Sequence, residues 1–254
     1  MNQLSILLLT LISISCTNQT KKDSTNTAVL KDPIKKETVD KSEKTNPKNK
    51  VYVEFEKNKD LLDIILLLPK ESFSSWEWNV EDRKKWYNEI KINNYYIDND
   101  PLFFNQKYLE PYQAAFTIVD GSWSINLYKT FDNSYIVITC DVTGDGKELN
   151  FYEFKSNKLK KYSDEISMFS NFRELVKNKD NQNNCTEQFE EIEYPFFEYN
   201  FTNKNKIEIE SSWYITKEEF GDCFNANAII YNFNPQTKKF EIEKTYWKAK
   251  NENN

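Results

Sequence analysis

The sequence predicts an α+β fold, built mostly of antiparallel β-meanders with a few short helices, in a single domain over residues 51–254. All 39 Trp, Tyr and Phe residues fall within these 204 positions, which gives the domain ample apolar material for a core. Alternation of apolar and polar residues with period two, interrupted by turn dipeptides, covers most of the domain. Apolar residues at helical spacing are confined to three short stretches.

The chain begins with a short apolar segment, residues 4–14, that is interrupted only by hydroxyl-bearing side chains. Its length is far below the roughly 20 residues that a helix needs to cross a bilayer, and is typical of the core of a signal peptide. Small Ser15 follows Ile14 and directly precedes Cys16. Together these residues resemble the lipobox of bacterial lipoproteins.

This resemblance implies that residues 1–15 are a lipoprotein signal peptide, and that Cys16 is acylated and becomes the first residue of the mature chain. A single acyl chain holds a membrane only marginally, whereas two or more anchor a protein stably, so the full lipoprotein modification is expected. The alternatives are ordinary secretion, in which Cys16 is lost with the cleaved peptide, and a frayed hydrophobic terminus with no targeting role. The resemblance covers only these first residues and implies nothing about the folded domain.

Residues 16–50 are predicted to be a disordered, Lys-rich tether. They contain nine Lys, five Asp or Glu and no aromatic residue. Such a segment cannot bury enough apolar surface to offset the entropy that ordering would cost. As a flexible coil it spans roughly 30 Å, which would hold a domain clear of the lipid headgroups.

Two short helices are expected at the start of the domain. The first begins near Asp60 and ends before Pro69, because proline lacks the N–H that a helix requires. The second follows Asn79, whose side chain can cap the first turn, and it places Trp86 and Ile90 on one face.

A first meander is expected from about residue 114 onward, with turns at residues 120–121, 132–133, 143–146 and 156–157. In one of its strands the apolar face would consist of Ile136, Ile138, Cys140 and Val142. In the preceding strand it would consist of Trp123, Ile125, Leu127 and Phe131. We expect these two strands to cover one common core.

A third helix is expected from Ser163. Its apolar stripe would consist of Ile166, Phe169, Phe172 and Val176. A second meander would follow it. The predicted strands of this meander lie near residues 196–201, 206–215, 228–233 and 240–247.

Three cysteines remain after Cys16, in a compartment where disulfides can form. Cys185 and Cys223 lie in polar, loop-like surroundings, whereas Cys140 lies on the apolar face of a predicted strand. We therefore expect a disulfide between Cys185 and Cys223. Cys140 is expected to be a buried free thiol.

The composition excludes several functional classes. The absence of His excludes Ser-His-Asp and Cys-His catalysis and nearly every usual zinc or copper site. The four Gly leave no phosphate-binding loop. Residues 51–254 carry 25 basic and 35 acidic side chains, whereas nucleic-acid binding depends on an excess of Lys and Arg. The sequence thus predicts no catalytic residue, metal, cofactor or nucleic-acid partner.

One acidic motif has two interpretations. Asp141, Thr143, Asp145 and Gly146 occupy the first, third, fifth and sixth positions of a calcium-binding loop. The twelfth position, which should hold a bidentate glutamate, is Tyr152. The other interpretation is a tight Asp-Gly hairpin between two strands.

The aromatic segment 73–112 offers a candidate binding surface. Trp76 and Trp78 flank a predicted loop, and aromatic rings of this kind anchor protein interfaces or stack on sugars. Core packing is the alternative use. Asp98 and Asp100, in the same segment, would suit either glycoside hydrolysis or a turn.

A second candidate surface is an acidic stripe on the last meander. Glu208 and Glu210 alternate with isoleucines in one predicted strand, and Glu241 and Glu243 flank an isoleucine in another. Facing solvent together, they would suit a basic protein partner. An ordinary solvated sheet face is the alternative.

These features favour a lipid-anchored lipoprotein of the bacterial cell envelope, held at the outer membrane and facing the periplasm or the outside. Its domain would be a non-enzymatic module that binds an envelope or secreted protein, on a plan similar to that of immunity lipoproteins. The alternative is a carbohydrate-binding or glycan-processing lipoprotein that uses the aromatic segment 73–112.

The lipid anchor is tested by metabolic labelling with radioactive palmitate in a bacterial host. We expect the label to enter the chain and to be lost in the Cys16→Ser variant, because the thiol is the proposed attachment point. No label in the natural chain, or equal labelling of both chains, would contradict the anchor.

Overall fold

A computed structural model describes residues 50–92, 96–98, 104–118, 121–144, 146–162, 169, 172–191, 197–203, 205–212 and 214–250. All of them belong to one compact unit, Asn46–Asn254. The predicted signal peptide, Cys16 and most of the predicted tether lie outside the described residues.

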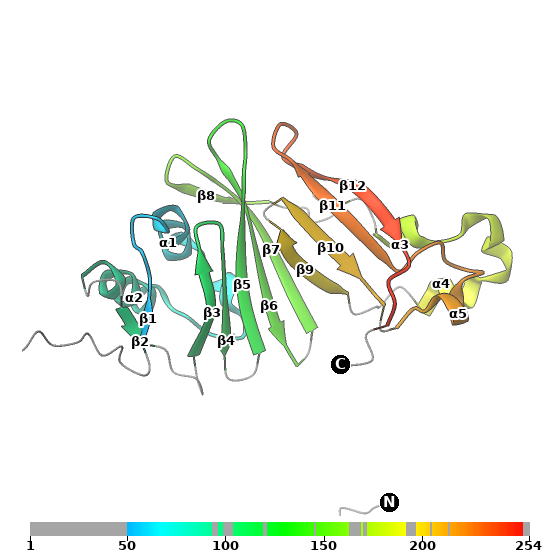
Figure 1. Cartoon of the computed structure of the whole chain (residues 1–254), viewed down its shortest axis with the longest axis horizontal. Coiled ribbons are helices and arrows are strands. Elements are labelled where there is room, and N and C mark those ends of the chain that lie inside the picture. The colour runs from blue at the N-terminus through cyan, green and yellow to red at the C-terminus, as the bar shows by residue number, and fades with distance from the viewer. Residues whose placement is uncertain are drawn as a thin grey trace, which may run out of the picture. The chain divides into compact units, whose positions relative to one another are not determined.

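The helices are short and the strands are all antiparallel (Figure 1). The helical segments are α1 Lys59–Leu67, η1 Lys70–Phe73, α2 Val80–Ile92, α3 Phe172–Val176, η2 Lys179–Asn184, α4 Thr186–Glu191 and α5 Lys217–Phe220, where η marks a 3-10 helix. Within the described ranges, no helix is long and apolar enough to cross a membrane.

The first predicted meander is a six-stranded sheet in the order β3-β4-β5-β6-β7-β8, and each strand pairs with its neighbour in sequence. It begins one strand earlier than predicted. Its strands are β3 Phe104–Glu110, β4 Gln113–Ile118, β5 Gly121–Lys129, β6 Tyr135–Thr143, β7 Gly146–Lys155 and β8 Lys158–Lys161. A separate pair, β1 Lys50–Tyr52 and β2 Tyr96–Asp98, forms a two-stranded sheet.

The second predicted meander is a four-stranded sheet in the order β12-β11-β10-β9. Its strands are β9 Glu198–Asn203, β10 Lys206–Glu210, β11 Ala228–Asn234 and β12 Lys239–Tyr246. β10 ends well before residue 215, because the N–H groups of Tyr214 and Ile215 turn back to the carbonyl of Ser211. Antiparallel sheets with a few short helices are thus the observed architecture, as predicted.

The two predicted helices at the start of the domain are confirmed. α1 ends at Leu67, two residues before Pro69. At the start of α2, the Asn79 side chain accepts hydrogen bonds from the N–H groups of Glu81 (2.9 Å) and Asp82 (3.0 Å). This satisfies two donors that the helix itself leaves unpaired.

Arg83 of α2 joins the two helices to each other. Its guanidinium donates to the carbonyls of Ile65 (2.7 Å), Leu66 (3.2 Å) and Leu68 (2.6 Å) at the end of α1. These carbonyls have no partner within their own helix and carry the negative end of its dipole, so a buried cation is favourable there.

The expectation that β5 and β6 cover one common core is wrong. The register places Trp123 opposite Asp141, and Ser124 opposite Cys140. The apolar set of β5 therefore points to one face of the sheet, and the set of β6 that contains Ile138 and Cys140 points to the other. Phe131 lies in the turn between them and is 69% exposed.

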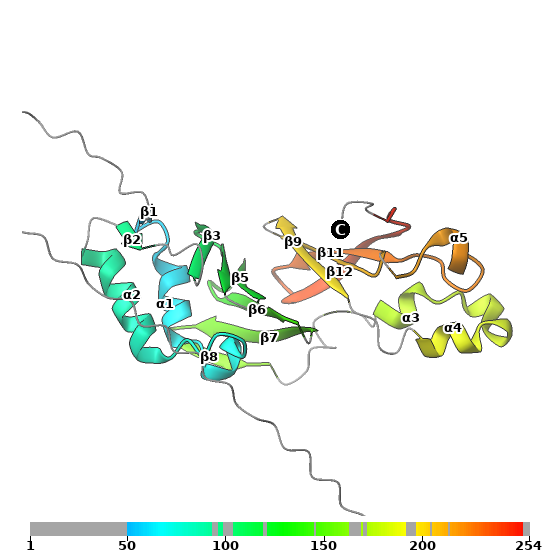
Figure 2. The same ribbon diagram turned by 90° about the horizontal axis from the view of Figure 1, so that it is seen from below.

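The six-stranded sheet consequently has a core on each face. Figure 2 shows α1 and α2 on one side of this sheet and the four-stranded sheet on the other. We call the first the helix-side core; α1, α2 and η1 pack there. It includes Leu61, Leu62, Ile65, Phe73, Trp86, Ile90, Phe116, Trp123, Ile125 and Leu127. We call the second the inter-sheet core, because the four-stranded sheet packs there. It includes Tyr128, Ile136, Ile138, Phe151, Ile207, Ile209, Ile229, Tyr231, Phe233 and Phe240.

The two sheets are fastened to each other at their hairpin tips. Lys238, in the β11–β12 turn, pairs with Asp132 (3.0 Å) in the β5–β6 turn and with Glu153 (2.5 Å) on β7. The N–H of Phe131 also donates to the carbonyl of Pro235 (3.2 Å). We call these contacts the hairpin clamp.

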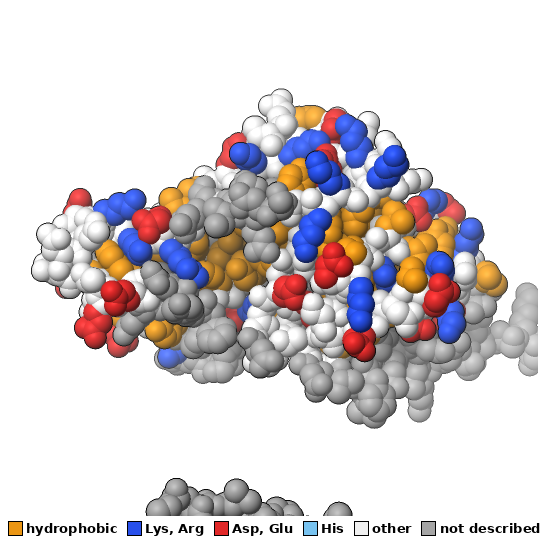
Figure 3. Space-filling view, turned by 180° about the vertical axis from the view of Figure 1, so that it is seen from behind, with side chains coloured by type: hydrophobic (Ala, Val, Ile, Leu, Met, Phe, Trp, Pro, Cys, Tyr) orange, Lys and Arg blue, Asp and Glu red, His pale blue; other side chains and the backbone are white. Residues whose placement is uncertain are grey.

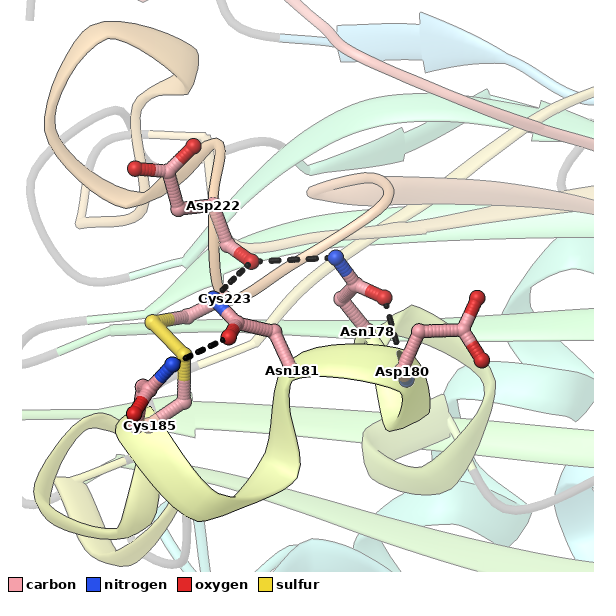
Figure 4. The surroundings of a disulfide bond; sticks show 7 residues. Asn178, Asp180, Asn181, Cys185, Asp222 and Cys223 are labelled. Carbon is pink, nitrogen blue, oxygen red and sulfur yellow. Dashed lines mark hydrogen bonds between the residues drawn. A yellow bond between two sulfur atoms is a disulfide. The ribbon is translucent and has the colours of Figure 1, made fainter.

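The predicted disulfide between Cys185 and Cys223 is present, with Cα atoms 5.5 Å apart (Figure 4). It connects the end of η2 to the loop after α5. Asn178 and Asn181 strengthen this junction, since both side-chain amides donate to the carbonyl of Asp222 (3.0 and 3.2 Å). The predicted helix from Ser163 is described only in part, as α3.

Removing the disulfide should lower the free energy of unfolding by about 4 kcal/mol, because the bond closes a loop of 38 residues in the unfolded chain. Urea denaturation of residues 17–254 and of the Cys185→Ser/Cys223→Ser variant measures this difference. Dithiothreitol serves as the control: it should destabilise the natural chain and leave the variant unchanged. Equal stabilities of the oxidised natural chain and the variant would contradict the prediction.

Candidate functional site

A cleft of about 570 Å³ lies between the six-stranded sheet and β9 of the four-stranded sheet. We call it the inter-sheet cleft. Its lining residues are Tyr108, Gln113, Ser122, Ser124, Cys140, Val142, Lys147, Glu198, Tyr199, Asn200 and Phe201. This volume is in the range of typical ligand-binding sites.

The floor of the cleft is one face of the six-stranded sheet. Ser122 lies opposite Val142 and Ser124 opposite Cys140, so these four side chains share a face. Lys147 lies opposite Val142 on the next strand and belongs to the same face. The serines and Cys140 are small, which leaves space above this part of the sheet.

The wall of the cleft is β9, which contributes the consecutive residues Glu198, Tyr199, Asn200 and Phe201. Successive side chains of a strand point to opposite faces of its sheet. A cleft lined by four residues in a row therefore runs along the edge of β9 and not over one of its faces. β9 is also the outermost strand of the four-stranded sheet.

The position of the cleft follows from the hairpin clamp. Asp132 in the β5–β6 turn and Glu153 near the end of β7 lie at one end of the six-stranded sheet. Ser122, Cys140 and Lys147 lie near its other end. Aromatic rings fill the space beside the clamp, with Tyr128 and Phe240 centroids 4.8 Å apart. The sheets are thus joined at one end and leave the cleft at the other.

An ion pair between Lys147 and Glu198 joins the floor of the cleft to its wall. The Lys147 side chain is 18% exposed, and the Glu198 side chain is 51% exposed. Each charge is therefore matched within the cleft. Solvent weakens such a half-exposed pair, so its main effect is to set the distance between β7 and β9 and not to add much stability.

Cys140 lies in the floor of the cleft as a buried free thiol, as predicted. Burial raises the pKa of this thiol to about 12, and the nearby charge of Lys147 opposes the rise only in part. The thiolate is the reactive form of cysteine, so Cys140 is not an activated nucleophile. Among the residues that the structure describes, no group of three or more His, Cys, Asp or Glu side chains is arranged to hold a metal ion.

The predicted binding residues Trp76 and Trp78 lie in an aromatic cluster beside the helix-side core. Their rings stack on each other, with centroids 4.2 Å apart and an angle of 15° between the planes. Trp78 is only 8% exposed and also contacts Phe73 and Trp86. The alternative use, core packing, describes Trp78 best, and Trp76 is half-buried against the same cluster.

Glu208 and Glu210, predicted as half of an acidic stripe, are largely enclosed. Their side chains are 17% and 12% exposed, and Lys248 pairs with both. Glu208 also accepts a hydrogen bond from the Tyr246 hydroxyl (2.9 Å), and Glu210 accepts one from Ser212 (2.6 Å). These two carboxylates do not form an open acidic surface.

Glu241 and Glu243, the other half of that stripe, are exposed on β12 but are also paired. Glu243 pairs with Lys206 (2.5 Å), and Glu241 accepts a hydrogen bond from the Asn234 amide (2.7 Å). Acidic and basic side chains are interspersed on the face shown in Figure 3. Neighbouring donors compensate these carboxylates, so the four glutamates do not face solvent together as an unpaired acidic stripe.

The described residues of the motif that begins at Asp141 lie on and between the paired strands β6 and β7. Asp141 is 2% exposed and its carboxylate accepts hydrogen bonds from the N–H and the hydroxyl of Ser75. β6 and β7 end on the pair Thr143 and Gly146, and Gly146 has a φ of 136°, which glycine tolerates far better than other residues. Asp98 ends β2, and Asp100 lies outside the described residues.

Most of the residues that line the cleft were not predicted from the sequence, among them Ser122, Ser124, Lys147, Glu198 and Asn200. One signal was present: Ser122 and Ser124 alternate with Trp123 and Ile125, which marks a polar face on a strand that is otherwise buried. Nothing in the local sequence indicated that β9 lies against this face.

No protein-family model and no curated protein matches the chain. A solved structure of a domain of an uncharacterized protein from Porphyromonas gingivalis is similar in fold, with a TM-score of 0.50 and 11% sequence identity. The match covers 72% of this chain and 98% of that domain. At this identity the similarity concerns the fold alone.

The raised pKa predicts that Cys140 reacts slowly with iodoacetamide in the native protein. At pH 8 a thiol of pKa about 12 is thiolate in about one molecule in 10,000, compared with about one in ten for an ordinary cysteine. Alkylation of residues 17–254, followed by mass spectrometry, should therefore be at least about 100-fold slower in buffer than in urea. Similar rates in the two solvents would show that the thiol is accessible and activated.

Proposed function

We propose that this chain is a lipid-anchored lipoprotein of the bacterial cell envelope whose domain binds another protein and catalyses no reaction. The observation that carries the binding role is the inter-sheet cleft. It is preformed, its charges are already matched, and its one thiol has a raised pKa. A site of this kind suits recognition better than acid–base or nucleophilic chemistry.

The proposed location in the cell envelope rests on the N-terminal sequence. Cys16 would carry the lipid and residues 16–50 would tether the domain at the outer membrane, facing the periplasm or the outside. The disulfide between Cys185 and Cys223 supports an oxidising compartment, because cytoplasmic thiols are usually kept reduced.

Rigidity supports a protein partner. The hairpin clamp joins the two sheets at one end, and the Lys147–Glu198 pair sets the distance between β7 and β9 at the other, so the cleft is already formed before a partner binds. Immunity lipoproteins, which neutralise an incoming toxin at the membrane, offer an architectural analogy for such a module.

Carbohydrate binding is the second candidate. Tyr108, which belongs to the aromatic segment 73–112, is 37% exposed and lines the cleft next to Gln113 and the two serines. An aromatic ring beside amide and hydroxyl groups is a usual surface for a sugar. The tryptophans of that segment do not add to this surface, because they pack with the helix-side core.

The proposed function is tested by capture from envelope extract with immobilised residues 17–254, which contain every described residue. We expect one protein at a stoichiometric ratio, identified by mass spectrometry and bound again after both proteins are purified. The matched control is the same chain after reduction and unfolding in urea, which should capture nothing at that ratio. Recovery of glycan alone, or equal capture by both baits, would contradict a protein-binding role.

A further inference from the structure

We propose that the open edge of β9 receives an extended, uncharged segment of the partner protein, which adds to the four-stranded sheet as a further strand inside the inter-sheet cleft. This inference rests on the proposed function for the existence of a protein partner. It adds the surface that binds, the conformation of the bound segment and the chemistry of its side chains.

The first argument is the direction of the cleft. β9 pairs with β10 on one side, through register pairs that include Glu198 with Glu210 and Asn200 with Glu208. In the sheets formed by the described residues, β9 has no strand on its other side. An edge strand presents a row of N–H and C=O groups on that side, and an extended peptide can pair with such a row.

The second argument is that β9 carries fewer charges than the edge strands β8 and β12. Proteins usually place lysines or other charges on exposed edges, because a charged edge discourages pairing with another chain. β8 has three lysines in four residues, and β12 carries two lysines and two glutamates. β9 contains a single charged residue, Glu198, and Lys147 pairs with it.

The third argument is the space beside that edge. A strand added to β9 would direct alternate side chains toward the floor of the cleft. There they would meet Cys140 and Val142, with Ser122 and Ser124 beside them and Phe201 of β9 on the same side. The small floor residues leave room, and the mixture of methyl, thiol and hydroxyl groups suits apolar side chains of moderate size.

The matched charges explain why the segment should be uncharged. Lys147 and Glu198 neutralise each other across the mouth between β7 and β9. A charged side chain of the partner would have to break this pair or remain without a counterion in the cleft, and both outcomes cost free energy. The run of four wall residues corresponds to a bound stretch of about 13 Å, or about four residues of extended peptide.

The test uses a phage-displayed library of random ten-residue peptides, selected on residues 17–254. We expect enriched peptides to carry uncharged stretches with apolar residues at alternate positions. A synthetic copy of the best peptide, labelled with a fluorophore, then gives a dissociation constant by anisotropy. Its backbone is N-methylated at every second residue, in two versions that differ in which set is methylated.

Strand addition makes a specific prediction for these two peptides. Only alternate N–H groups of an added strand point to β9, so one version should lose binding by at least about tenfold and the other should retain it. Equal effects of the two versions would overturn the proposal. This readout depends on the peptide and not on the folding of a variant.

Two variants place the binding in the cleft. Ser124→Trp fills the floor of the cleft and should lower the affinity for the peptide by at least about tenfold. Thr245→Trp puts the same ring on β12, at the other edge of the four-stranded sheet, and should leave this affinity unchanged. Thermal melts of both variants establish that they fold. Equal affinities of the two folded variants would overturn the proposal.

The remaining outcomes separate this inference from the proposed function. An envelope protein that binds the Ser124→Trp variant as well as the natural chain would leave the proposed function standing and remove strand addition. If residues 17–254 form a dimer and dimerisation competes with peptide binding, the edge of β9 binds a second copy of this chain. That result would overturn the proposal of a partner segment. Binding of soluble glycan in the cleft, with no peptide enriched, would overturn it as well.

Discussion

The six-stranded sheet is buried on both of its faces, and the remaining architecture follows from that constraint. β6 is buried without interruption from Tyr135 to Asp141, so it needs cover on each side. α1, α2 and η1 supply one cover, and the four-stranded sheet supplies the other. The second cover is fastened at the hairpin clamp and by the pair between Lys147 and Glu198, and the cleft is the space that this arrangement leaves open.

Local chemistry was sufficient to predict the elements but not their relation in space. The Asn79 cap and the stop before Pro69 depend on a few neighbouring residues, and the structure bears them out. The strand pairs Ile118–Gly121 and Thr143–Gly146 lie where hairpins were predicted from the sequence. The predicted alternation of side chains within β5 and within β6 is also confirmed, since each apolar set, apart from Phe131 in the turn, lies in a single core. The prediction that β5 and β6 cover one common core is wrong because their register depends on the five residues that connect them. A shift by one residue exchanges the two faces of a strand.

The candidate site was harder to predict than the fold, because it is assembled from distant parts of the chain. The disulfide could be inferred from two cysteines in polar surroundings, since that argument needs no knowledge of the fold. The pairing of Glu208 and Glu210 could not be predicted, because their partner Lys248 lies beyond β12 and reaches back to them. The cleft is lined by residues of β5, β6 and β7 on one side and of β9 on the other, and no local pattern in β9 predicts this arrangement.

The disulfide also has a topological meaning. The two cysteines are 38 positions apart and the segment between them contains both β9 and β10, so half of the four-stranded sheet lies inside a covalent ring. In a reducing compartment this ring is open, and the segment is held by non-covalent contacts alone. In an oxidising compartment the ring closes and restricts how far the segment can move when the sheet opens locally. The cleft wall β9 is therefore restrained covalently only in an oxidising compartment.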